Sequence, residues 1–228
     1  MIDLPAFDFP PYRLSGVVYG TLMNDPLALA MLGEAVHQAP YKAPPKAPIL
    51  FVKPRNTLAA SGAALRVPHG WTALAIGANL GLVIGRTACR VPAAGAMDFI
   101  AGCVIVNDVS LPHESFYRPS IRFIARDGFC PIGPLVKDIA SIPNPDALAI
   151  RVYVDDRVVH SASTAGRVRS AATLLADVTD FMTLNPGDVL MLGASAGAPQ
   201  VHAGQRVAIE IDGLGRLENR VVAEARAA

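Results

Sequence analysis

Residues 102–134 read GCVIVNDVSLPHESFYRPSIRFIARDGFCPIGP, and the prediction of the fold starts from this stretch. The apolar run at 103–106 is typical of a buried strand, and it ends at Asn107 and Asp108. Polar and aromatic side chains then follow closely, in a chain of which only 17% is charged. They are Ser110, His113, Glu114, Tyr117, Arg118, Arg122, Arg126 and Asp127. Because functional side chains collect on loops held by a rigid scaffold, we expect the site here.

Composition excludes several classes of protein. The chain has 228 residues, of which 52% are hydrophobic, so one large domain or two small ones with a sizeable core are expected. A net charge of +1, from dispersed Lys and Arg residues, argues against a nucleic-acid partner. The three cysteines have no paired spacing, which favours a reducing compartment. With no signal-like N-terminus and no apolar run of about 20 residues, a cytoplasmic protein without membrane partners is expected.

The N-terminal part is predicted to be a minor region. A strand is expected at 14–22, and Asn24-Asp25-Pro26 is a helix-start signal before a helix at 27–37. Four prolines in 39–48 predict an extended connector. Residues 1–48 are therefore predicted to form an arm, strand, short helix and connector, and residues 49–228 to form the catalytic domain.

The second part is dominated by strand signals. A short strand at 49–53 ends in Lys53, and alternating residues at 147–154 and 157–160 flank Asp155-Asp156, which predicts a hairpin. The segment 171–181 has helical spacing, and closing strands are expected at 204–211 and 216–222. Many short strands with a few short helices predict a strand-dominated α+β fold.

Five sequence words resemble the fumarylacetoacetate hydrolase family, and they occur in the family's order. They are QAPYKAPPKAP at 38–48, FVKPRNT at 51–57, NDVSLPHESFYRP at 107–119, RDGFCPIGP at 126–134 and LNPGD at 184–188. The closer resemblance is to one branch, the N-terminal half or small subunit of the bifunctional isomerase/decarboxylases of 4-hydroxyphenylacetate (homoprotocatechuate) breakdown. It implies a mixed β-roll or sandwich around a central pocket.

The resemblance implies a reaction on small di- or tricarboxylates. The expected steps are decarboxylation of 5-oxopent-3-ene-1,2,5-tricarboxylate, isomerisation of 2-hydroxyhepta-2,4-diene-1,7-dioate, or both, through an enolate-like intermediate. Such a reaction needs positive charge or hydrogen-bond donors where the negative charge develops. Two alternatives stay open: a non-catalytic partner of a metal-bearing sister chain, and an acylpyruvate-type hydrolase. A homodimer, or a hetero-oligomer with such a sister chain, is expected.

The resemblance also assigns roles to individual residues of this chain. Lys53, Glu114 and Arg126 are the predicted catalytic residues, with Glu114 as proton carrier. The predicted substrate-binding residues are Arg55, His113, Tyr117, Arg118, Asp127, Thr164 and Ser195.

The family's divalent ion, expected to be Mg²⁺, is held by an aspartate and a Glu-x-Glu pair. Asp108 matches the aspartate, but the two glutamate positions fall on Gly77 and Asn79. Since glycine offers no ligand and asparagine only one neutral oxygen, we expect a weak, substrate-assisted ion or none.

Overall fold

The computed structural model describes residues 17–113 and 120–225. Within these residues the strands form an eight-stranded, a five-stranded and a two-stranded sheet. The largest sheet has β9 (Lys137–Asp138) beside β7 and a main path of seven strands. In spatial order these are β2 (Ile49–Lys53), β1 (Val18–Leu22), β12 (Val189–Met191), β6 (Ala78–Ile84), β7 (Ile100–Asn107), β8 (Cys130–Ile132) and β3 (Leu58–Ala60). The β1–β12 and β3–β8 pairs are parallel and the others antiparallel, so the sheet is mixed.

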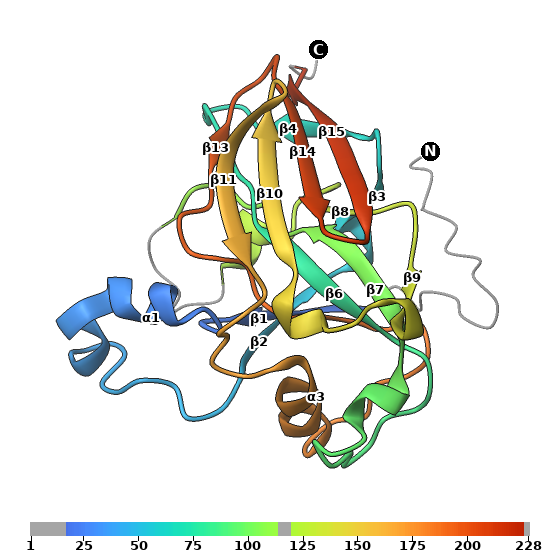
Figure 1. Cartoon of the computed structure of the whole chain (residues 1–228). Coiled ribbons are helices and arrows are strands. Elements are labelled where there is room, and N and C mark those ends of the chain that lie inside the picture. Colours follow the sequence, from blue (N-terminus) through green and yellow to red (C-terminus); the bar gives the residue numbers. More distant parts are fainter. Residues whose placement is uncertain (1–16, 114–119, 226–228) are drawn as a thin grey trace.

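The five-stranded sheet stands over the central strands β6 and β7 of the larger sheet (Figure 1). Its strands are, in spatial order, β11 (Arg157–Ser163), β10 (Ala149–Val154), β14 (Arg206–Ile211), β15 (Gly215–Ala223) and β4 (Ala64–Val67). The predicted hairpin is confirmed, because Val154 pairs with Arg157. Its two turn residues, Asp155 and Asp156, have φ of 47° and 65°, as a tight hairpin turn requires. The small sheet pairs β13 (Gln200–Val201) with β5 (Leu74–Ala75).

The main core fills the space between the two large sheets. Along β6, Leu80, Leu82 and Ile84 belong to it, and Val83 packs in a second cluster with residues such as Val104 of β7. This alternation is the expected consequence of the two-residue period of a strand. All seven residues of β6 are buried, so both faces of the central strands are covered. The strand-dominated α+β class predicted from the sequence is confirmed.

The helices are short and lie at the margins of the sheets. In the described ranges the α-helices are α1 (Pro26–Leu32), α2 (Ile121–Ile124) and α3 (Ala171–Thr179). The 3₁₀ turns are η1 (Gly33–His37), η2 (Arg55–Thr57), η3 (Ala96–Phe99), η4 (Ile139–Ser141) and η5 (Pro145–Ala147). The helix predicted at 27–37 divides at Gly33, whose φ of 50° interrupts α-helical geometry. None of the helices in 17–113 and 120–225 is long and apolar enough to span a bilayer.

The N-terminal strand β1 is part of the main sheet. It pairs with β2 through Val18 and Lys53 and lies parallel to β12. The division of the chain at residue 48 stays a prediction, with β1 from the first part hydrogen-bonded to β2 and β12 from the second.

Candidate active site

A cavity of about 910 Å³ lies where β1, β2, the end of β7, α2 and the loop 194–198 meet. Its wall is largely apolar, and Asp108 is the only Asp, Glu, Lys or Arg that lines it among the described residues. The other polar side chains on the wall are Thr21, Ser110, His113, Ser120, Ser195 and Gln200. A concave, mostly apolar space with a few polar groups is the usual form of a small-molecule site.

Lys53 lies beside this cavity and is completely buried. Its Nζ donates hydrogen bonds to the backbone carbonyls of Val109 (2.9 Å), Ile124 (2.9 Å) and Phe129 (3.1 Å). Since these bonds use the three N–H groups of an ammonium, the 2.6 Å contact with Oδ1 of Asp108 is an ionic one. Lys53, at the end of β2, therefore holds together three segments: the loop after β7, the last turn of α2 and the residue before β8.

Asp108 connects Lys53 to the cavity. Its backbone N–H donates to the carbonyl of Gly77 at 2.9 Å, and its side chain is 15% exposed. The carboxylate therefore faces the buried ammonium and also forms part of the cavity wall. A charged pair in this position supplies a fixed carboxylate to any molecule that enters the cavity.

Cys130 lies near this pair, and its thiol is not a plausible nucleophile. Burial raises its pKa to about 12, an effect that Lys53 opposes and Asp108 reinforces. At neutral pH the thiol is therefore protonated, whereas the reactive form of cysteine is the thiolate.

His113 lines the cavity in a fixed orientation. Its Nδ1 lies 2.8 Å from the carbonyl oxygen of Leu111, and its ring stacks on Phe123 at 5.3 Å between centroids. Because a carbonyl only accepts, Nδ1 carries the proton of this hydrogen bond.

Three other residues that the sequence assigns to the site do not line the cavity. Asp127 is exposed and accepts a hydrogen bond from Asn56 at 2.8 Å. Arg126 is half-buried and Arg55 is exposed, and neither lines the cavity wall. Their roles in catalysis and binding stay predictions, as do those of Glu114, Tyr117 and Arg118, which lie outside the described residues.

Thr164 and Ser195 differ in position. Thr164 is buried away from the cavity, where its Oγ1 accepts the N–H of Leu148 at 2.8 Å. Ser195 lines the cavity, and its Oγ accepts a hydrogen bond from Nη2 of Arg167 at 2.8 Å. Sequence reasoning missed Arg167, since no local pattern separates it from Arg169, which pairs with Asp177 instead.

The residues at the family's metal positions do not fit a magnesium site. A Cβ on Gly77 would lie 2.6 Å from the carbonyl oxygen of Asp108, so the backbone occupies the space where a glutamate side chain would begin. The Oδ1 of Asn79 accepts the N–H of Gly193 at 2.9 Å. Asp108, the remaining carboxylate, is paired with Lys53. Among the described residues no three His, Cys, Asp or Glu side chains are grouped as a metal site would require.

Asn79 instead has a structural contact that can be tested. Replacing it with alanine removes the acceptor from the buried N–H of Gly193 and is expected to lower the free energy of unfolding by about 1–3 kcal/mol. Urea unfolding measures this loss. Asn56→Ala, which removes an exposed amide, is the control and should cost less than about 0.5 kcal/mol. An Asn79→Ala variant as stable as the control would contradict a stabilising role for the hydrogen bond between Asn79 and Gly193.

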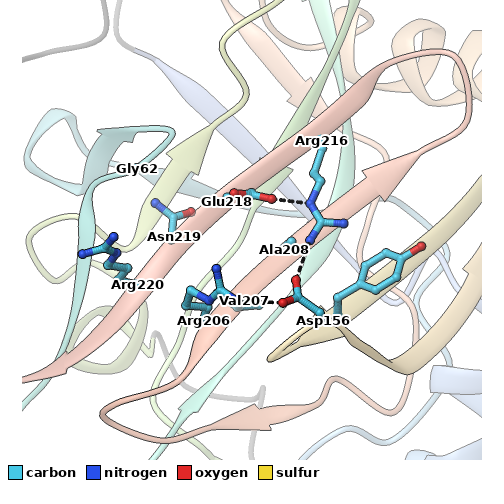
Figure 2. A pocket seen from close by; sticks show the side chains of 10 residues that line it. Gly62, Asp156, Arg206, Val207, Ala208, Arg216, Glu218, Asn219 and Arg220 are labelled. Atoms are coloured by element: carbon cyan, nitrogen blue, oxygen red, sulfur yellow. Dashed lines mark hydrogen bonds and ion pairs between the residues drawn. The ribbon is translucent and has the colours of Figure 1, made fainter.

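A second, smaller hollow lies on the five-stranded sheet, and two of the three arginines that line it are paired with carboxylates. Its volume is about 330 Å³, and Figure 2 shows Arg206 and Arg216 reaching Asp156, with Glu218 also against Arg216. Hydrogen bonds from Arg216 and Tyr153 hold the pKa of Glu210 below its ordinary value. Arg206 and Arg216 form ion pairs with carboxylates of the same sheet and its hairpin turn, so the larger cavity is the better candidate site.

The family model for the fumarylacetoacetate (FAA) hydrolase C-terminal region matches residues 17–222. The chain belongs to the fumarylacetoacetate hydrolase family. It is 41% identical over 211 residues to the 4-hydroxyphenylacetate degradation bifunctional isomerase/decarboxylase of Escherichia coli. This match covers 92% of the chain and 48% of the relative, so the chain spans about half the length of that relative.

Solved structures agree on the fold. The 5-carboxymethyl-2-hydroxymuconate delta-isomerase of Mycobacterium smegmatis matches with a TM-score of 0.76 and 27% identity, over 93% of this chain and 81% of that one. The fumarylpyruvate hydrolase of Pseudomonas aeruginosa, solved with Mn²⁺ and pyruvate, matches with a TM-score of 0.79 over 97% and 95% of the two chains. At 24% identity, the second likeness concerns the fold alone.

Proposed function

We propose that this family member is an isomerase/decarboxylase of homoprotocatechuate meta-cleavage that works without a metal held by the protein. The observation that carries the proposal is the buried Lys53–Asp108 pair on the wall of a largely apolar cavity. The expected substrates are 5-oxopent-3-ene-1,2,5-tricarboxylate, 2-hydroxyhepta-2,4-diene-1,7-dioate, or both.

The chemistry requires a proton carrier and a way to bind an anion. Asp108 is the carboxylate that lines the described cavity wall, and Lys53 fixes its position, so Asp108 is the proposed proton carrier. Glu114, which the family resemblance assigns to this role, is the second candidate. His113 in its imidazolium form, with Nδ1–H held by the carbonyl of Leu111, is the proposed donor through Nε2–H to the substrate oxygen on which enolate charge develops.

The comparisons support this function in two ways. The chain is 41% identical to a bifunctional isomerase/decarboxylase, and its fold matches a delta-isomerase of the family. An acylpyruvate-type hydrolase is less well supported, because that chemistry relies on a metal-activated water and the three metal positions do not fit an ion here.

A partner chain is also part of the proposal. In the matched relatives this region is about half of the protein, and we propose that it packs against a second copy or a sister chain. The mass of the purified protein in solution, measured by light scattering, tests this expectation, and a monomer at all concentrations would contradict it.

Absorbance of 2-hydroxyhepta-2,4-diene-1,7-dioate tests both the reaction and the lack of a metal. The purified chain is assayed alone, with magnesium and with excess EDTA. Equal turnover within about twofold in all three is expected, because the proposed proton carrier Asp108 is held by Lys53. Turnover that EDTA abolishes and magnesium restores would contradict the metal-free site. No turnover by a folded sample would instead favour the role of a non-catalytic partner.

A further inference from the structure

Arg167 lies behind the cavity with an unusually buried charge. Its side chain is 2% exposed, and its Nη2 donates to the carbonyl of Ser163 (3.0 Å) and to Oγ of Ser195 (2.8 Å). Within 17–113 and 120–225, its Nε and Nη1 have no hydrogen-bond partner. Since a guanidinium has five N–H donors and buried donors are normally satisfied, this arginine has donor capacity that the protein does not use.

Asp25 is paired with this charge but makes no good hydrogen bond to it. Oδ2 of Asp25 lies 3.5 Å from Nη1, too far for a good hydrogen bond, and it accepts the N–H of Ala196 at 2.7 Å. The other oxygen of Asp25 accepts the N–H of Leu27 at the start of α1. Burial lowers the pKa of Arg167, and Asp25 opposes this effect. Arg167 and Asp25 therefore form an ion pair without a direct hydrogen bond, and a further anion near Arg167 would add to its stabilisation.

Ser195 links this charge to the cavity. Its Oγ accepts from Arg167, so its own hydroxyl hydrogen remains to donate to a molecule in the cavity that it lines. The described cavity wall otherwise carries the negative charge of Asp108 and no Lys or Arg side chain. A multiply anionic substrate therefore needs a positive subsite away from Asp108.

We propose that Arg167 and Ser195 form the subsite for one carboxylate of a dicarboxylate substrate. Ser195 donates its O–H to the carboxylate. Arg167 does not touch the substrate; it donates a hydrogen bond to Oγ of Ser195, supplies the positive charge and acts as a positioning residue. The subsite lies in the cavity of the proposed active site, so this inference rests on the proposed function. It specifies that the substrate carries a carboxylate that binds away from Asp108.

Calorimetric titration of the purified chain with heptanedioate and with the neutral 1,7-heptanediol tests the subsite without turnover. Arg167→Met is expected to weaken heptanedioate binding about 10- to 100-fold, because it removes the positive charge that acts on the carboxylate through Ser195, and to change heptanediol binding less than about twofold. Arg167→Lys should recover part of the loss. Ser195→Ala should resemble Arg167→Met, and the double variant should be no weaker than either single one, because both act along one path.

Arg206→Met is the control, since Arg206 is exposed and pairs with Asp156 on the other sheet. The subsite is refuted if the unmodified chain does not bind heptanedioate. It is also refuted if Arg167→Met binds heptanedioate as the unmodified chain does, or loses both ligands equally.

Kinetics separate this inference from the proposed function. With active enzyme, Arg167→Met should raise KM at least tenfold and change kcat less than about threefold, as loss of uniform binding does. If heptanedioate binding depends on Arg167 but 2-hydroxyhepta-2,4-diene-1,7-dioate is not turned over, the subsite stands and the isomerase/decarboxylase proposal fails. If turnover is normal in Arg167→Met, the subsite fails and the function stands.

Discussion

Lys53→Met is expected to lower the free energy of unfolding by about 3–5 kcal/mol, because it breaks a buried ion pair and leaves the other charge without its partner. The same change removes the donor from three backbone carbonyls, those of Val109, Ile124 and Phe129. Since these carbonyls belong to segments around the cavity, turnover should fall as well. Urea unfolding followed by circular dichroism measures the stability of the variant.

A second substitution shows whether the ion pair causes the loss. Asp108→Asn neutralises the partner, so the double variant should lose less stability than the sum of the two single losses, with a coupling energy of about 1–3 kcal/mol. Additive losses would mean that the carbonyl bonds matter and the pair does not. A Lys53→Met chain within about 1 kcal/mol of the original would contradict the anchoring role altogether.

Asp108→Asn is expected to lower kcat by about 10²- to 10⁴-fold, the usual contribution of a positioned proton carrier. The amide keeps the shape of the side chain, so substrate binding should change little and KM should stay within a few-fold. Turnover of 2-hydroxyhepta-2,4-diene-1,7-dioate is measured by absorbance. The protein concentration is corrected for the folded fraction, which urea unfolding gives.

Two further carboxylate variants complete the experiment. Asp127→Asn is the matched control, because Asp127 is exposed and bonded to Asn56 away from the cavity, and its kcat should stay within about twofold. Glu114→Gln tests the residue that the family resemblance favours. If Glu114→Gln loses turnover and Asp108→Asn keeps it, the proton carrier is Glu114, and Asp108 serves only as the partner of Lys53.

The sequence by itself determined much of the fold, because its signals are local. Alternating residues and the pair Asp155-Asp156 specify the β10–β11 hairpin, since turn and strand preferences act over a few neighbours. Asp25 and Pro26 mark the start of α1 for the same reason. The sequence also singled out Lys53, Asp108, His113 and Ser195, which lie at or beside one cavity.

Only the tertiary structure decided which of these groups meet. Lys53 contacts carbonyls 56 to 76 residues away in the chain, and Arg167 reaches Ser195 because the loop after β11 lies against the loop after β12. The sequence shows only that a glutamate is missing at position 77. The structure shows that the backbone of Asp108 fills the space beside Gly77. Such contacts depend on strand pairings between distant segments, such as β1 with β12, and no local preference encodes them. Thus the sequence specified the groups, and long-range pairing decided which charges face each other and which face the cavity.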